Sequence, residues 1–171
     1  MESKTPKEGL SMKKKGFTEV MDNIGKVFSH SEVKYKVTIE DTTISNGLGF
    51  SQDGLSHYFI DTPTKKVAKF AYVKEIGDVS FESYMIEFNG DVSPDDMCMD
   101  NEGLLCISAY GEGRILRWNP ENGRKMDERK LTYPNVASRC LDRHLNLYIT
   151  NTKSFDKNEM YGGGLFYVEL N

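Results

Sequence analysis

Two polar residues with metal-ligand chemistry, Asn46 and Asp95, stand 49 residues apart, and Ser138 takes a matching place 43 residues further on. Each precedes a short apolar segment, in the stretches ISNGLGFSQDG, PDDMCMDNEG and ASRCLDRHLNLYIT. An amide oxygen and a carboxylate suit a hard cation such as Ca²⁺, Mg²⁺ or Mn²⁺. Such a cation polarises a carbonyl and lowers the pKa of a bound water. If the repeat brings Asn46 and Asp95 together, they predict a divalent-metal site.

Other roles for these residues stay open. Asn46 and Asp95 could instead cap turns by accepting hydrogen bonds from nearby backbone N–H groups. Asp96 lies beside Asp95 and both acids could ligate, although adjacent residues of a strand point to opposite faces. The remaining candidates are isolated in the chain, so we predict turn roles for three aspartates and surface or turn positions for the histidines: Asp53, Asp100, Asp142, His30, His57 and His144.

The elements that must position these residues are short strands joined by tight turns. From Gly25 onward the apolar residues alternate with polar ones, which is typical of a half-buried strand. From Ile44 the chain has three copies of one plan, an inner strand, a tight turn and a return strand, and the turn contains glycine in the first two copies. Many short strands indicate a sandwich, a barrel or a propeller, and a repeat of this length favours the propeller.

We therefore predict an all-β fold, a partial β-propeller of about three to four blades in one domain spanning residues 1–171. Residues 1–24 form an irregular head with a short helix over Phe17–Ile24, and the blades span about 25–90, 91–135 and 136–171. So few blades cannot close a ring. Either the chain is part of a longer one, or it self-associates through an open propeller edge so that a second copy completes the ring.

Composition narrows the partners. The 171 residues carry a net charge of −4, which gives no reason to expect a nucleic acid or an acidic membrane surface as partner. The apolar runs are too short to cross a bilayer. The three cysteines are odd in number and lack metal-site spacing. We interpret Cys98 and Cys106 as buried thiols and predict a reducing, cytoplasmic location.

The motifs together resemble a known family. ISNGLGFSQDG, YFIDT, PDDMCMDNEG, AYGEGRILRWNPENGR, LYIT and GGGLF follow the order of the gluconolactonase, regucalcin and luciferin-regenerating-enzyme (senescence-marker-protein) family from about Gly25 to Phe166. The resemblance implies a six-bladed β-propeller with one divalent metal at the mouth of its channel. It also implies either hydrolysis of sugar lactones or calcium binding. The resemblance further implies, by the Ser-Asn-Gly-Leu motif, that Asn46 is a metal ligand. By the match to the family's Pro-Asp-Gly-Met motif, it implies that Asp95 is both a metal ligand and the catalytic general base.

The chain also departs from the family pattern. It matches the C-terminal half, and the family's metal-ligating Glu and Arg-Asn substrate clamp have no counterpart here. Asp96 replaces a glycine beside the site, and Cys106 stands where a tryptophan is usual. We therefore expect a sugar-lactone hydrolase that depends on Ca²⁺, or on Zn²⁺, Mn²⁺ or Mg²⁺, and is weakly active or inactive by itself. The alternatives are a non-catalytic calcium-binding or regulatory protein and a truncated product that does not fold stably.

Overall fold

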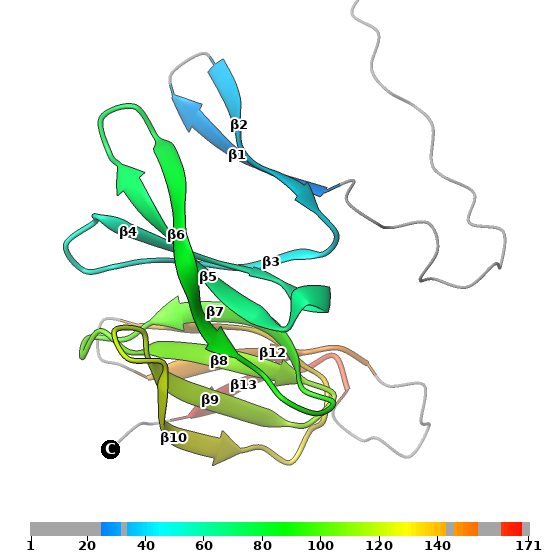
Figure 1. The fold of residues 1–171 in the computed structure, drawn as a ribbon. Coiled ribbons are helices and arrows are strands. Elements are labelled where there is room, and N and C mark those ends of the chain that lie inside the picture. Colours follow the sequence, from blue (N-terminus) through cyan, green and yellow to red (C-terminus); the bar gives the residue numbers. More distant parts are fainter. Residues whose placement is uncertain (1–24, 32–33, 143–145, 154–161, 169–171) are drawn as a thin grey trace, which may run out of the picture.

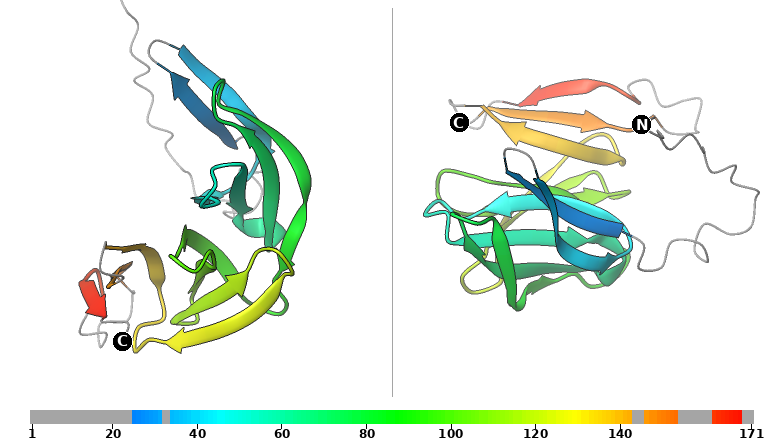
Figure 2. Two further views of the ribbon diagram at one scale, coloured as in Figure 1. Left: turned by 90° about the vertical axis from the view of Figure 1, so that its left-hand side faces the viewer. Right: turned by 90° about the horizontal axis from the view of Figure 1, so that it is seen from above.

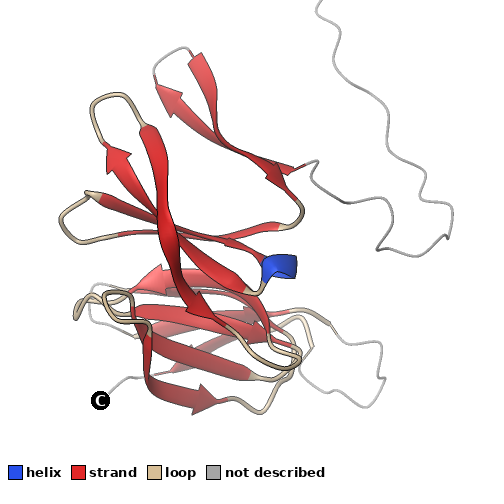
Figure 3. Cartoon of the chain, viewed as in Figure 1, coloured by secondary structure: helices blue, strands red, loops and turns tan. Residues whose placement is uncertain are grey.

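Strands make up most of the described protein (Figure 3). The computed structural model describes residues 25–31, 34–142, 146–153 and 162–168, and the helix predicted over Phe17–Ile24 lies outside them. Within these ranges the one helical element is the short 3₁₀ turn η1 (Thr62–Thr64). No helix in this part of the chain has the length and apolar character needed to cross a membrane.

The strands form four antiparallel sheets in which strands adjacent in sequence pair with one another (Figure 1). We call them the hairpin and the first, second and third blades. The hairpin holds β1 (Gly25–Ser31) and β2 (Lys34–Thr42). The first blade holds β3 (Ser45–Phe50), β4 (Ser56–Asp61), β5 (Lys66–Val73) and β6 (Asp78–Glu87). The second holds β7 (Ser93–Met99), β8 (Leu105–Tyr110), β9 (Arg114–Asn119) and β10 (Arg124–Lys130). The third holds β11 (Val136–Leu141), β12 (Leu147–Asn151) and β13 (Leu165–Val168).

A polar side chain closes the turn after each inner strand, β3, β7 or β11. Its oxygen accepts a hydrogen bond from a backbone N–H at the start of the return strand, which replaces a ladder bond where the chain reverses. The second blade adds Gly103 with φ 76°, a conformation that favours glycine. The side-chain bonds run to Ser51 from Ser56, to Asp100 from Leu104 and to Asp142 from Asn146, at 2.8–3.0 Å.

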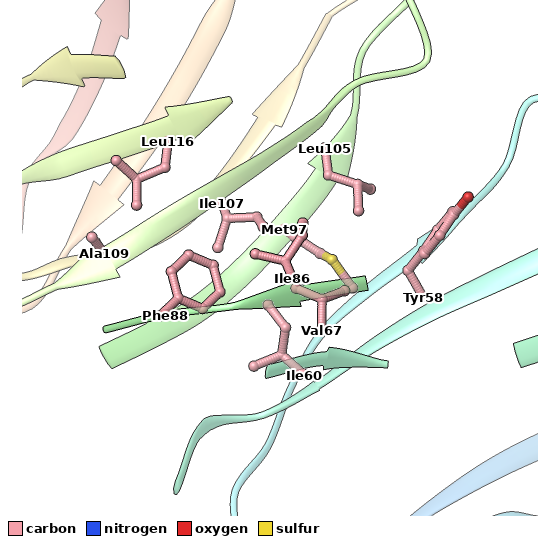
Figure 4. Close-up of a cluster of buried hydrophobic side chains, with 10 residues drawn as sticks. All are labelled: Tyr58, Ile60, Val67, Ile86, Phe88, Met97, Leu105, Ile107, Ala109 and Leu116. Carbon is pink, nitrogen blue, oxygen red and sulfur yellow. The ribbon is translucent and has the colours of Figure 1, made fainter. Parts of the chain in front are cut away.

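Three apolar layers hold the sheets together, one between each successive pair. Strands β4 and β8 bury side chains on both faces, because alternate residues of a strand enter the layers on either side. Burying a large apolar side chain contributes about 1.5–3 kcal/mol. The largest layer joins the first and second blades (Figure 4) through Tyr58, Ile60, Val67, Ile86, Phe88, Met97, Leu105, Ile107, Ala109 and Leu116.

The four sheets follow one another around an open arc, most clearly in the left view of Figure 2. Each inner strand contacts the next, β3 with β7 and β7 with β11. Radial stacking of small antiparallel sheets around shared inner strands is the architecture of a β-propeller. The predicted all-β, partial-propeller fold is confirmed.

Candidate functional site

A one-residue bulge interrupts each inner strand near its N-terminal end. In the first blade, Ser45 pairs with Asp61 and Leu48 pairs with Phe59, so β3 has one more residue than β4 between these pairs. Strands β7 and β11 carry the same extra residue at the matching place. A bulge bends its strand and re-aims the side chains, and bulges are frequent next to active sites.

The bulges of the first and second blades contain the predicted site residues, Asn46 and Asp95. Counted from the last pair before each bulge, Ala137 takes the matching place in the third blade. The predicted match of Ser138 is therefore wrong by one residue, because Ser138 falls at the position of Asp96. A methyl group cannot ligate a metal, so the third blade adds no ligand side chain at this position.

An open pocket of about 470 Å³ lies where the three bulges meet. It joins the two residues that the sequence predicts as metal ligands, although they belong to different blades. No cationic side chain of the described residues forms part of its wall. The lining residues are Ser45, Asn46, Gly47, Leu48, Asp95, Asp96, Ala137 and Ser138.

A threonine hydroxyl links the two bulges and orients the Asn46 amide. The Nδ2 atom of Asn46 donates a hydrogen bond to Oγ1 of Thr62 at 2.8 Å, and that hydroxyl donates to the carbonyl oxygen of Pro94 at 2.8 Å. With its nitrogen engaged, the amide keeps Oδ1 as the atom available to a cation. Asn46 therefore does not cap a backbone N–H through this oxygen. Thr62 lies in a turn of ordinary composition, so the sequence carries no signal for this role.

Gly47 allows the first two blades to approach closely at the site. A Cβ atom at this position would lie 2.8 Å from the backbone nitrogen of Met97 and 3.0 Å from the carbonyl oxygen of Asp95. Both contacts are with backbone, which cannot swing aside as a flexible side chain can. The glycine after Asn46 is thus required by the approach of β3 to β7, and its place in the Ser-Asn-Gly-Leu motif is the signal that sequence reasoning could have used.

Asp95 is a carboxylate without local compensation. It makes no hydrogen bond in the part of the chain that the structure describes. Burial and, to a smaller extent, the neighbouring charge of Asp96 raise the pKa of its carboxyl to about 6, against a lowering by Arg139. Burial and a like charge both disfavour the ionised form. A cation beside Asp95 would relieve both effects.

The oxygen atoms that this pocket offers are of the type that a hard divalent cation prefers, but they are few. Asn46 offers an amide oxygen and Asp95 a carboxylate, both of which such ions prefer. Within the described ranges there is no cluster of three or more His, Cys, Asp or Glu side chains suited to a metal. The described residues therefore supply two oxygen ligands, whereas Ca²⁺ takes about 6–8.

The carboxylate of Asp96 is committed to other partners. Its Oδ2 atom accepts hydrogen bonds from the Ser138 hydroxyl at 2.5 Å and from the Arg139 backbone N–H at 3.3 Å. Its Oδ1 atom accepts one from the Met97 N–H at 2.9 Å. Of the two adjacent acids, Asp96 joins the second blade to the third, and Asp95 keeps free oxygens.

The structure places the other candidates outside this pocket. Asp53, Asp100 and Asp142 accept backbone N–H hydrogen bonds in turns, which confirms their predicted roles. The prediction for His57 is wrong: it is 4% exposed on β4, where it packs against Phe50 and Phe70. Burial lowers the pKa of its imidazole to about 4, so it is neutral at physiological pH. His30 lies in β1, and His144 lies outside the described residues.

Comparison with known proteins assigns the chain to a family. The family model for the SMP-30/gluconolactonase/LRE-like region matches residues 9–153. The chain belongs to this family. An uncharacterised protein of Sulfolobus acidocaldarius is 39% identical over 143 residues, which cover 81% of this chain and 50% of that protein. Regucalcin of Xenopus laevis is 30% identical over 158 residues, 85% of this chain and 52% of the relative.

The fold is also that of a solved family structure. The calcium-binding protein regucalcin of Agrobacterium tumefaciens superposes with a TM-score of 0.78 at 18% identity, over 87% of this chain and 53% of that one. This likeness establishes the propeller fold. The chain spans about half the length of the curated relatives that it matches.

Proposed function

We propose that the protein binds a divalent cation, Ca²⁺ foremost, through Asn46 and Asp95 and takes part in the hydrolysis of sugar lactones. The observation that carries the proposal is the convergence of these two side chains, each on a bulge of its own blade, in one open pocket. Membership of a divalent-metal-dependent family supports it.

In this proposal Asp95 is the general base. Within the described residues its carboxylate has no hydrogen bond to lose when it accepts a proton. At neutral pH most of the carboxylate is ionised and can accept the proton of the water that attacks the lactone carbonyl. A bound divalent cation supplies Lewis-acid polarisation of that carbonyl and stabilises the negative charge that develops on its oxygen.

Asn46 acts by position rather than by proton transfer. Its amide cannot titrate, and the hydrogen bond to Thr62 holds its oxygen in one orientation. Such fixed dipoles assist catalysis because they need no rearrangement when charge develops. We therefore assign Asn46 a ligand role alone.

The described residues account for a weak site. They provide two ligand oxygens, and the pocket wall presents no arginine or lysine to hold a polar substrate. We expect metal affinity and lactone turnover well below those of a site with a complete ligand set. The same observation favours a second candidate function, calcium binding without catalysis.

A paired assay tests both candidates. Hydrolysis of gluconolactone is measured with the 171-residue chain in Ca²⁺, Mn²⁺ or Zn²⁺ and after chelation, and the melting temperature is recorded with and without Ca²⁺. We expect weak, metal-dependent turnover and a Ca²⁺-dependent rise in Tm, both lost in Asp95→Ala. The matched control is Asp91→Asn, which removes the same charge from an exposed loop before β7.

The outcomes separate the possibilities. A Tm response without turnover selects the non-catalytic function. Turnover that survives both Asp95→Ala and chelation would place the chemistry elsewhere and overturn the proposal. Equal losses in Asp91→Asn and Asp95→Ala would show a general charge effect instead of a ligand role.

A further inference from the structure

Two cysteines face each other across the second blade. Cys98 on β7 and Cys106 on β8 are direct partners in the strand register. Opposite residues of an antiparallel pair have Cα atoms about 4.5–5.5 Å apart, which lies inside the about 4.4–6.8 Å that a disulfide requires. Both side chains belong to the apolar layer between the second and third blades, and the Cys106 thiol donates a hydrogen bond to Oδ2 of Asp100 at 3.8 Å.

A buried arginine that forms no ion pair within the described residues lies beside this pair. The Arg139 side chain comes from β11 and is 4% exposed. Its guanidinium donates to the Ser108 hydroxyl and to the backbone oxygen of Asp96 at 2.9 Å, and no described residue accepts a hydrogen bond from its Nε. Its positive charge acts on the sulfurs of Cys98 and Cys106 and on the Asp96 carboxylate. A buried guanidinium is costly unless an anion accompanies it, and a thiolate at Cys98 would add one.

The two thiols have unequal environments. The neighbouring Cys106 thiol and then the Arg139 guanidinium lower the pKa of the Cys98 thiol to about 7, against the raising effect of burial. The neighbouring Cys98 sulfur and burial raise the pKa of Cys106. This division is typical of an attacking sulfur and a resolving sulfur.

Small molecules can approach the pair from between the blades. Cys98 is half-buried, and Cys106 lines a cavity of about 250 Å³. Apolar side chains of both blades form much of that cavity wall, including Ile115, Leu141 and Leu147. The space exceeds that of a few water molecules, each of which occupies about 30 Å³.

We propose that Cys98 and Cys106 are a dithiol that a hydroperoxide oxidises to a cross-strand disulfide. The sulfur of Cys98 attacks one peroxide oxygen, the O–O bond breaks, and an alcohol or water leaves as Cys98 becomes a sulfenic acid. The Cys106 thiol then attacks that sulfur, the S–S bond forms, and the hydroxyl leaves as water with the proton of Cys106. Two thiols are oxidised and one hydroperoxide is reduced.

Mapping of the oxidised chain tests the proposal. The native 171-residue chain is exposed to hydrogen peroxide, alkylated and cleaved before aspartate residues, so that cleavage at Asp100 separates the two cysteines. We expect disulfide-linked peptides that contain Cys98 and Cys106, with the exposed Cys140 still open to alkylation. Oxidation of Cys140 while the pair stays reduced, or disulfides between molecules alone, would overturn the proposal.

Single variants then identify the attacking sulfur. In Cys106→Ser, a dimedone trap should label Cys98 as a sulfenic acid, and in Cys98→Ser the label on Cys106 should be about tenfold lower. Cys140→Ser is the matched control and should form the disulfide at the native rate. Equal labelling of Cys98 and Cys106 would contradict the assignment of roles. The mapping of the native chain is independent of any effect that these variants have on folding.

Discussion

The two ends of the inner strands show opposite chemistry. After each inner strand, a turn side chain is occupied by backbone donors, as Asp100 is by the N–H groups of Glu102 and Leu104 and by the Arg117 guanidinium. Near the opposite end of β7, at the bulge, the Asp95 carboxylate has no hydrogen bond within the described structure. Aspartate therefore has two roles at the two ends of β7. Asp100 stabilises the turn, whereas the charge of Asp95 is available to a ligand.

The difference shows why composition alone cannot identify a site. A carboxylate that accepts several hydrogen bonds has its charge compensated, and a cation would have to displace those donors. A half-buried carboxylate with no donors and a second acid beside it is destabilised as an anion, which is typical of functional positions. Asp95 and Asp100 differ in their hydrogen-bond partners and not in their residue type, and the partners determine their roles.

The largest effect is expected at the turn end. Asp100→Ala removes a buried carboxylate that four donors share, and it leaves the N–H of Leu104 and the Arg117 guanidinium without their acceptor. We expect a loss of about 3 kcal/mol in the free energy of unfolding. Urea unfolding measures it. The control Asp53→Ala removes an exposed turn carboxylate and should cost clearly less. Equal losses would contradict the comparison.

A glycine at the bulge end gives the next largest effect. Gly47→Ala places a methyl group against backbone atoms of β7, so the first and second blades must separate slightly. We expect a loss of about 2 kcal/mol in unfolding free energy, together with a weaker response of Tm to Ca²⁺. Gly49→Ala is the matched control on the same strand, because its Cβ would meet its nearest neighbour, a Leu105 methyl, at 3.6 Å. A loss in Gly49→Ala as large as in Gly47→Ala would refute this explanation.

Much of the fold can be predicted from the sequence. Alternating apolar residues, Gly-containing turns and a repeat of similar length three times over specify strands, their order and a propeller. These patterns lie within short stretches of the sequence, so they can be recognised without knowledge of how the sheets pack. His57 shows their limit: on β4 both faces are buried, and alternation cannot tell a surface histidine from one enclosed by aromatic rings.

The site was predictable in part. The residue types and the repeat bring Asn46 and Asp95 to matching places, but a one-residue bulge changes the register without any change in composition. For this reason the spacing of the repeat indicates Ser138, whereas the strand register gives Ala137. Thr62, Gly47 and Arg139 act through contacts between blades, which no local pattern records.

The third prediction has the opposite sign from the first two. The folded-state pKa of Asp95 is raised to about 6, above its ordinary value of 3.8, so its charged form opposes folding. The contribution of the protonated Asp95 carboxyl to the free energy of unfolding is fully present below about pH 4 and is lost as the pH rises through about 6. Asp95→Asn stays uncharged at every pH and therefore avoids this loss of stability. We expect the variant to be more stable than the native chain at pH 7.5, by on the order of 1 kcal/mol after allowance for solvent screening.

Paired melting curves at pH 7.5 and pH 4 check this sign. Groups other than Asp95 titrate alike in both proteins, so the difference between them reports Asp95. The advantage of Asp95→Asn should vanish at pH 4. An Asp95→Asn chain that is less stable than the native one at pH 7.5 would show that the carboxylate has a compensating partner in the free protein.

The smallest effect on stability tests how the bulge end is organised. Thr62→Val keeps the shape of the side chain but removes the hydroxyl between the Asn46 amide and the Pro94 carbonyl. We expect a loss of about 0.5–1 kcal/mol, yet most of the Ca²⁺-induced rise in Tm should disappear because the Asn46 oxygen is no longer oriented. Thr64→Val is the control from the same 3₁₀ turn, since its hydroxyl donates to the Asp61 carbonyl and accepts from the Lys66 N–H, both close by in the chain and away from the pocket. If both variants keep the full Ca²⁺-induced rise in Tm, the bulge alone positions Asn46 and the Thr62 hydroxyl is a structural link. If Thr62→Val alone loses that rise, the cation site depends on contact between the first and second blades.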